Sequence, residues 1–361
     1  MMLLLDSSGS MLRKPNCACT TPPCEECLPN CNASEQDRWT RIVGATTGSF
    51  ASFGCTTVTR TAEAGATYDV GYPFPWHRIN AASVQRPDGI LDTYATRVRF
   101  GLASFDGLDT YFGANPLISA VDFDKTLSVQ APGMFSYGGW ASDGSPRRRP
   151  DGSLVGEFQF PHDTELRMMD TGIRSASAPE GALVVTHTLE EMRTRAAAMQ
   201  KSILDTRPYG GTPIAAALDD LYALFTQDQN GFAGAARDAK RYIVLVTDGV
   251  PDSDYRDYAC DCMTTAECGG DPAQFSCPYP TPEDAALHLR CGFGGASQCA
   301  GPVDKVYVIG LNTSDAAVRT QLDKIAAAGG SKQGRYTEDP IQLRDALNAV
   351  LDETLTESKS P

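Results

Sequence analysis

Short, strongly apolar segments that alternate with amphipathic ones constrain the fold of this 361-residue chain more than any other feature. Residues 1–5, 241–247 (RYIVLVT) and 305–311 (KVYVIGL) are continuous apolar runs of the kind typical of strands buried on both faces. A strand with one face in water would alternate polar and apolar residues instead. Further strands are predicted at residues 97–105, 181–186 and 334–337.

The amphipathic segments are read as helices, because their apolar residues recur every three or four positions. One of them begins with a start signature, since Thr281 is a capping residue and a proline follows it in the first turn. Ser314 is predicted to cap another helix, which ends at Gly329 and Gly330. The predicted helices cover residues 189–204, 213–225, 281–290, 314–328 and 341–355.

This alternation predicts an α/β fold, with a doubly wound, mostly parallel sheet and helices on both of its faces. Long segments rich in glycine, proline and serine interrupt the alternation, yet the regular elements on either side of them complete each other. We therefore expect a single domain over residues 1–355 and a polar tail or linker at 356–361. Large loop insertions are predicted at about residues 12–35, 49–95, 107–180 and 249–280.

Twelve cysteines gather towards the two ends of the chain, and two of the insertions are rich in them. Clustered cysteines in loop-like segments are typical of disulfides, which persist in oxidising compartments. Structural zinc is the alternative, because Cys24 and Cys27 form a C-x-x-C pair. The disulfide candidates are Cys17, Cys19, Cys24, Cys27, Cys31, Cys55, Cys260, Cys262, Cys268, Cys277, Cys291 and Cys299.

The net charge of −14 and the distribution of apolar residues exclude two classes of partner. A nucleic-acid groove needs a basic face, and a transmembrane helix needs about 18 or more consecutive apolar residues. We therefore expect no nucleic-acid partner and no membrane span. Disulfides predict an extracellular or cell-surface location. Because no basic and apolar leader precedes the first strand, we expect the signal peptide to be missing from this chain.

Polar residues follow the predicted strands at the points where the strands end. Asp6, Ser8 and Ser10 follow the first strand, Asp248 follows the strand RYIVLVT, and Thr212 precedes a helix in a G-G-T-P turn. Ligands of open α/β sheets bind beyond the carboxyl ends of the strands, so we expect these side chains to converge. Two carboxylates and three hydroxyls predict a site for a hard cation. Mg²⁺ is the expected ion, with Mn²⁺ and Ca²⁺ as alternatives.

These five residues resemble the metal-ion-dependent adhesion site (MIDAS) of von Willebrand factor A (vWA) domains, whose pattern is D-x-S-x-S, a later Thr and a later T/S-D-G. The order of the elements over residues 1–355 also resembles the Rossmann-like vWA fold. The resemblance implies that Ser8, Ser10 and Thr212 contact the metal, and that Asp6 and Asp248 act directly or through water. It also implies that the ion accepts a carboxylate from a partner protein.

A narrower resemblance concerns the vWA domain of PilY-type adhesins at the tips of bacterial type IV pili. It is carried by the sequences YATRVRFGLASFD and GGTPIAAALDDL, by the long insertion after the first helix and by the cysteine-rich loops. It implies an adhesion or protein-interaction module of an exported bacterial surface or pilus-associated protein. The expected partners are a protein that offers an acidic side chain, a host or cell-surface component, or pilus subunits.

The insertions at 12–35 and 249–280 begin beside predicted metal ligands, and the resemblance to the vWA fold, in which the third strand runs antiparallel beside the second, implies that the insertion at 107–180 begins at the same sheet edge. We expect them to surround the ion as a rim that disulfides hold in shape.

Two other functions stay open. A cytosolic vWA subunit that partners a chelatase-type ATPase would carry the same metal site, but it would have no need of twelve clustered cysteines. A metal-dependent hydrolase is the second alternative. The chain has no nucleophile elbow, H-E-x-x-H motif or phosphate-cradling glycine loop, so we expect no enzymatic activity.

Overall fold

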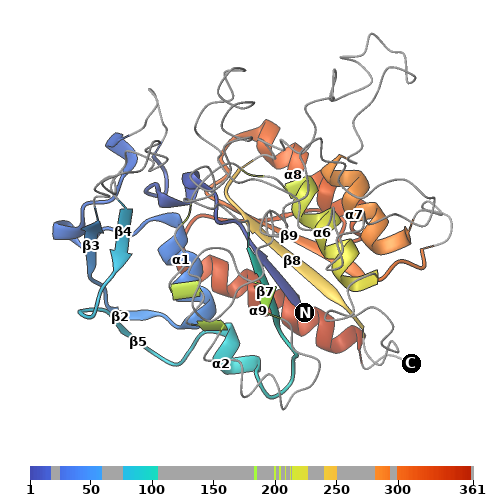
Figure 1. Ribbon diagram of the computed structural model, residues 1–361, viewed down its shortest axis with the longest axis horizontal. Helices are drawn as coiled ribbons and strands as arrows, with labels where there is room; N and C mark the ends of the chain where they lie inside the picture. Colours follow the sequence, from blue (N-terminus) through green and yellow to red (C-terminus); the bar gives the residue numbers. More distant parts are fainter. Residues whose placement is uncertain are drawn as a thin grey trace, which may run out of the picture.

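A central sheet lies at the middle of the fold (Figure 1). It has six strands in the order β10-β9-β8-β1-β6-β7. Neighbouring strands pair in parallel, except that β7 runs antiparallel to β6. The predicted α/β fold with a mostly parallel sheet is therefore confirmed. The strands are β1 (Met2–Leu5), β6 (Gly101–Ser104), β7 (Leu183–Val184), β8 (Tyr242–Thr247), β9 (Lys305–Leu311) and β10 (Arg335–Thr337).

The structure is a computed structural model. It describes residues 1–17, 25–58, 76–104, 183–184, 199–200, 203–204, 208, 212, 214–226, 240–249, 281–292 and 299–358.

Helices cover both faces of the sheet, as a doubly wound fold requires (Figure 1). One face packs against α1 (Arg38–Thr47), α2 (Ile90–Tyr94) and α9 (Pro340–Glu357). The other packs against α6 (Ile214–Thr226), α7 (Pro282–Cys291) and α8 (Ala316–Ala328). None of the helices within the described ranges is both long and apolar enough to cross a bilayer.

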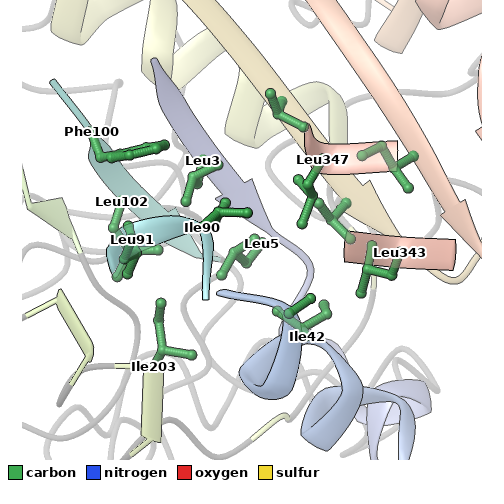
Figure 2. Close-up of a cluster of buried hydrophobic side chains, with 14 of the residues drawn as sticks. Leu3, Leu5, Ile42, Ile90, Leu91, Phe100, Leu102, Ile203, Leu343 and Leu347 are labelled. Carbon is green, nitrogen blue, oxygen red and sulfur yellow. The ribbon is translucent and has the colours of Figure 1, made fainter. Parts of the chain in front are cut away.

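The residues of β1 explain why that strand is apolar throughout. Side chains of a strand alternate between its two faces. Leu3 and Leu5 belong to the hydrophobic cluster under α1 and α9, whereas Met2 and Leu4 belong to the cluster under α6, α7 and α8. Figure 2 shows Leu3 and Leu5 beside side chains from these helices, including Ile42 of α1. A polar residue at any of these positions would be buried without a partner.

The structure corrects one predicted helix cap. The cap of α8 is Asp315, whose carboxylate accepts the backbone N–H of Ala317 at 2.7 Å. Ser314 instead donates its backbone N–H to the carbonyl oxygen of Asn312 at 3.2 Å. Both residue types are good caps, but the charge of an aspartate also interacts favourably with the positive end of the helix dipole.

Most other predicted boundaries differ little from the observed ones, but the strand predicted at 97–105 begins only at Gly101, the first residue of β6. Thr281 caps α7 as predicted, since its hydroxyl accepts the backbone N–H of Asp284 at 3.2 Å. Helix α9 begins one residue before the predicted start and runs two residues into the predicted tail. Of the helix predicted at 189–204, the structure describes only residues 199–200 and 203–204. Met199 and Ile203 are buried in the core, and the rest of this segment lies outside the described ranges.

The predicted insertion at 49–95 contains two small antiparallel sheets of its own. In one, β2 (Phe50–Ser52) pairs with β5 (Val84–Gln85), and in the other, β3 (Cys55–Val58) pairs with β4 (Trp76–Ile79). These strands pair with each other and do not extend the central sheet. The strands of the insertion therefore form a separate layer beside α1 (Figure 1), whereas α2, at the end of the same predicted insertion, packs on the central sheet.

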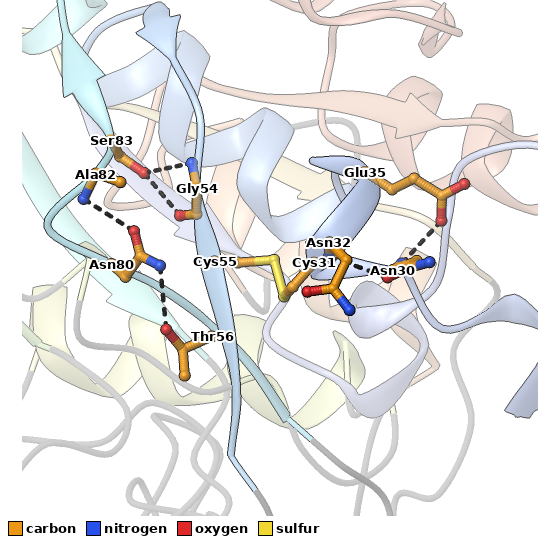
Figure 3. Close-up of a disulfide and its surroundings, with 10 residues drawn as sticks. All are labelled: Asn30, Cys31, Asn32, Glu35, Gly54, Cys55, Thr56, Asn80, Ala82 and Ser83. Carbon is orange, nitrogen blue, oxygen red and sulfur yellow. Dashed lines mark hydrogen bonds between the residues drawn. A yellow bond between two sulfur atoms is a disulfide. The ribbon is translucent and has the colours of Figure 1, made fainter.

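Three disulfides join the described cysteines: Cys17–Cys27, Cys31–Cys55 and Cys291–Cys299. Figure 3 shows that Cys31–Cys55 joins the short turn at Cys31–Ala33 to β3. Because Cys27 is bonded to Cys17, the zinc alternative is wrong for that cysteine. The remaining candidates lie in parts of the chain that are not described, namely Cys19, Cys24, Cys260, Cys262, Cys268 and Cys277.

Candidate functional site

The predicted site residues Asp6 and Asp248 stand immediately past the ends of two neighbouring parallel strands. β1 pairs with β8, with Leu5 beside Val246. The backbone N–H of Asp6 continues this ladder by donating to the carbonyl oxygen of Val246 at 2.9 Å. Both aspartates therefore lie at the carboxyl edge of the sheet, where ligands of open α/β folds bind.

The carboxylate of Asp6 is buried and is held at both oxygens. Oδ1 accepts the backbone N–H of Ser8 at 2.8 Å, and Oδ2 accepts the hydroxyl of Thr247 at 2.6 Å. The first contact folds the loop after β1 back on itself, and the second ties that loop to the end of β8. Two segments far apart in the sequence thus fix the orientation of this carboxylate.

Ser8, Ser10 and Asp248 form a continuous chain of hydrogen bonds. The Oγ atoms of Ser8 and Ser10 are 2.9 Å apart, and the Ser10 hydroxyl donates to Oδ1 of Asp248 at 2.7 Å. Both serines lie at the start of a short 3₁₀ helix, Gly9–Leu12, for which Ser8 is the N-terminal flanking residue. Four of the five predicted residues are therefore linked by hydrogen bonds.

Thr212, the fifth predicted residue, is buried two residues before the start of α6. Its backbone carbonyl accepts the N–H of Ile214 at 2.9 Å. Ile214 belongs to the same hydrophobic cluster as Met2 and Leu4 of β1, so the start of α6 packs over the face of the sheet at that strand. A contact between the Thr212 hydroxyl and a bound ion stays a prediction.

Arg38, the first residue of α1, also lies in the site, although no motif in the sequence points to it. Its Nη1 forms an ion pair with Oδ2 of Asp248. The two side chains are 12% and 1% exposed, so water screens this pair far less than a surface pair. Asp248 therefore has one oxygen bonded to Ser10 and the other to Arg38.

The site contains two buried carboxyl groups, those of Asp6 and Asp248. Burial and, secondly, the neighbouring charge of Asp248 raise the pKa of Asp6 to about 7, while the hydrogen bonds from Ser8 and Thr247 act in the opposite direction. Arg38 balances one of the two carboxylates. A site with more carboxylates than cations attracts further positive charge.

The donor set fits a hard divalent cation. The side chains of Asp6, Ser8, Ser10 and Asp248 offer oxygen atoms alone, and oxygen ligands suit Mg²⁺, Mn²⁺ and Ca²⁺. Within the described part of the chain, no group of three or more His, Cys, Asp or Glu residues could hold a metal ion. An ion at this edge would therefore depend on the serine hydroxyls as well as on the two carboxylates.

Asp37, the residue before Arg38, is also buried, but its carboxylate caps a helix instead of facing the candidate metal site. It caps α1, because its Oδ1 accepts the backbone N–H of Thr40 at 2.6 Å. Burial raises the pKa of Asp37 to about 6, against the effect of the hydrogen bonds from Thr40. This cap fixes the first turn of α1 and with it the position of Arg38.

Asp37→Asn is expected to stabilise the protein at neutral pH but not in acid. The pKa of Asp37 is about 6 in the folded protein and about 3.9 in the unfolded chain, so its ionisation above pH 6 costs folding free energy that is absent below pH 4. Asparagine keeps an oxygen for the N–H of Thr40 and avoids this cost. Urea unfolding should show a gain on the order of 2 kcal/mol at pH 7, shrinking towards zero at pH 4.

The exposed cap of α8 provides the control for this experiment. Asp315→Asn makes the same chemical change at a site where the carboxylate stays in water. Its effect on the free energy of unfolding should vary much less between pH 4 and pH 7. A pH-independent effect of Asp37→Asn would contradict the role of burial.

Two residues of the site, Arg38 and Thr247, are not among the residues predicted from the sequence. Thr247 precedes Asp248 in the T-D-G motif, so the motif itself contains the signal for it. Arg38 carries no such signal, because its partner Asp248 is 210 residues away.

The expected rim of insertions is described in part. The first insertion is bonded within itself, since Lys14 donates its backbone N–H to the carbonyl oxygen of Cys27 at 2.7 Å, and it is bonded to the start of α1, since Arg38 donates its backbone N–H to the carbonyl oxygen of Arg13 at 3.1 Å. The segment between the 3₁₀ helix and α1 is thus closed by a disulfide and by backbone hydrogen bonds. The insertion at 107–180 and nearly all of the one at 249–280 lie outside the described ranges.

Comparison with known proteins gives little further information. No family model matches the chain, and no curated protein matches it. Among solved structures, the chain is similar to the pilus adhesin SpaC from Lactobacillus rhamnosus GG, with 11% sequence identity and a TM-score of 0.38. That match covers 99% of this chain and 30% of the SpaC chain. Because the likeness is this weak, the interpretation of the site rests on its own contacts.

Proposed function

We propose that this chain is a metal-dependent adhesion or protein-interaction module of the vWA type. The observation that carries the proposal is the hydrogen-bonded set of Asp6, Ser8, Ser10 and Asp248 at the carboxyl edge of β1 and β8. Together with Thr212, these residues fill the MIDAS pattern. The function proposed for them is to hold Mg²⁺, with Mn²⁺ and Ca²⁺ as alternatives, for the recognition of a partner carboxylate.

Each residue has a separate task in this proposal. Ser8, Ser10 and Thr212 would offer hydroxyl oxygens to the ion, and the two aspartates would offer charge, directly or through water. Thr247 orients the carboxylate of Asp6. When bound, the ion supplies a position that accepts an oxygen of the partner's acidic side chain. Neutral hydroxyl ligands leave more of its positive charge for that oxygen than a set of carboxylates would.

The three disulfides support an exported protein, because such bonds persist in oxidising compartments. They favour a bacterial surface or pilus-associated module over a cytosolic vWA subunit that partners an ATPase. For the partner we propose an acidic protein, a host or cell-surface component, or a pilus subunit.

We propose binding rather than catalysis. The residues linked at the site are Asp6, Ser8, Ser10, Arg38, Thr247 and Asp248. This set includes no histidine, the most common acid–base group, and no lysine or cysteine nucleophile, and the carboxylate in it with a raised pKa, Asp6, has both oxygens held by Ser8 and Thr247. A metal-dependent hydrolase therefore has less support than an adhesion module.

A polyglutamate-coated sensor surface tests the proposed function. The chain carries a net charge of −14, so it should be repelled by this polyanion unless a divalent ion links the two. We expect retention in Mg²⁺, release in EDTA and no retention on a matched polyglutamine surface. Retention that is equal in Mg²⁺ and EDTA, or that is absent in both, would contradict the proposal.

A further inference from the structure

We propose that Arg38 competes with the divalent ion for Asp248. In this inference the guanidinium neutralises Asp248 while no ion is bound, and it must leave that carboxylate for the ion to bind there. Arg38 therefore sets the affinity of the site for its ion. The inference rests on the proposed function, because it concerns the same metal site.

The position of Arg38 is unfavourable for helix α1 itself. A positive charge in the first turn of a helix faces the positive end of the helix dipole, which favours acidic residues there. The preceding cap, Asp37, follows this preference, and Arg38 does not. What the arginine gains at this position is its ion pair with Asp248. We therefore attribute a role in the candidate site, rather than in helix stability, to the Arg38–Asp248 ion pair.

The guanidinium of Arg38 is only partly satisfied where it lies. A guanidinium has five N–H donors, and the Nε of Arg38 is buried with no hydrogen-bond partner among the described residues. An arginine with a purely structural role would be expected to use its donors more completely. Its side chain also keeps 12% of its surface exposed, so it has a route to water. Leaving Asp248 would give the unsatisfied Nε water as a partner.

The backbone of Arg38 does not have to move for this exchange. Its N–H is bonded to the carbonyl of Arg13, and the cap by Asp37 holds the first turn of the helix. The long side chain can rotate while these contacts remain. The competition is thus confined to one side chain.

The contacts of Asp248 show why two cations exclude each other. One carboxylate oxygen accepts the hydroxyl of Ser10 and the other is paired with Arg38. An ion held by Asp248 and Ser10 would lie beside the guanidinium, and two positive charges in a poorly screened place repel each other. Binding of the ion therefore favours release of the arginine.

Calorimetric titration with Mg²⁺ tests this inference on three variants and the wild type. Arg38→Gln removes the competing charge, so we expect it to bind Mg²⁺ about tenfold more tightly. Arg38→Lys keeps a charge but lacks the planar fork of the guanidinium, so its affinity should fall between the two. The matched control is Arg41→Gln, since Arg41 lies on the same helix but bonds Asn312 and the carbonyl of Glu338.

Thermal unfolding adds a readout that does not depend on calorimetry. Without an ion, Arg38→Gln leaves both carboxylates of the site without a cation, so its melting temperature in EDTA should be below that of the wild type. Mg²⁺ should therefore raise the melting temperature of this variant more than that of the wild type. If Arg38→Gln does not fold, the titration of Arg38→Lys still decides the question.

The outcomes separate this inference from the proposed function. Equal Mg²⁺ affinity in the wild type and all variants would overturn the competition and leave the metal site standing. Weaker binding by Arg38→Gln would also overturn it, because Arg38 would then assist the ion. No binding of Mg²⁺ by any of the proteins would contradict both proposals together.

Discussion

Asp6→Asn is expected to weaken the binding of Mg²⁺ by about 100-fold. The substitution preserves the size of the side chain but removes a buried negative charge directly after β1. It also replaces one of the two acceptor oxygens by an NH₂ group, so if the amide oxygen keeps the N–H of Ser8, the hydroxyl of Thr247 must accept from this side chain instead of donating to it. Both changes act on the ion, the first through charge and the second through the position of the serine loop. Calorimetric titration measures the affinity.

Two further variants show whether the loss is specific to the site. Thr212→Ala should weaken binding less, by about tenfold, because it removes a neutral ligand. Asp315→Asn removes the same charge from the exposed cap of α8 and should leave the affinity unchanged. If Asp6→Asn bound Mg²⁺ within twofold of the wild type, Asp6 would not be part of a metal site.

Leu347→Ala is expected to destabilise the protein by about 3 kcal/mol, within the usual range for a buried leucine. Leu347 lies on α9 and is 1% exposed in the cluster that also contains Leu3 and Leu5 of β1. Figure 2 shows it in that cluster, together with Leu343 of the same helix. Removal of the side chain leaves a cavity that the surrounding helices and sheet fill only in part. Urea unfolding measures the loss of stability.

The same helix supplies a matched control. Ile341 also lies on α9, but it is 64% exposed. Ile341→Ala should change the free energy of unfolding by about 0.5 kcal/mol or less, because alanine suits a helix well and little buried surface is lost. Similar effects of the two substitutions would contradict the packing of α9 against the sheet.

The Asp6→Asn and Leu347→Ala experiments test two connected parts of the fold, the end of β1 and the core beneath it. Packing of α1 and α9 against β1 fixes where that strand ends, and the strand end fixes Asp6. A core variant should therefore lower stability while the protein that stays folded still binds Mg²⁺. A site variant should lower affinity with a much smaller effect on stability.

The main strands could be predicted because burial on both faces leaves a plain sequence pattern. β1, β8 and β9 are apolar throughout, and each was predicted to within one residue of its observed bounds. The preference for polar capping residues also predicted the cap of α7, Thr281, correctly. For α8 the same preference predicted Ser314, whereas the observed cap is its neighbour Asp315. Adjacent good capping residues compete, and the pattern alone does not distinguish between them.

The small sheets of the insertion at 49–95 could not be predicted in the same way. β2 and β5 are two or three residues long and have little periodicity. Their pairing depends on contacts with each other and with α1. In one such contact, the side-chain amide of Gln85 donates a hydrogen bond to the hydroxyl of Thr47 in α1 at 2.8 Å. Short strands of this kind form where tertiary contacts place them.

The sequence by itself determined the α/β fold and which polar residues lie at the carboxyl edge of β1 and β8, since buried strands need apolar residues and polar residues follow them where they end. Its pattern singles out Asp6, Ser8, Ser10 and Asp248, which are linked by hydrogen bonds in the structure. Only the tertiary structure decided that Arg38 meets Asp248 and that Cys17 pairs with Cys27 and Cys31 with Cys55. The physical reason is that a local pattern reports which face of an element is buried, whereas the partner of a side chain depends on how distant segments pack.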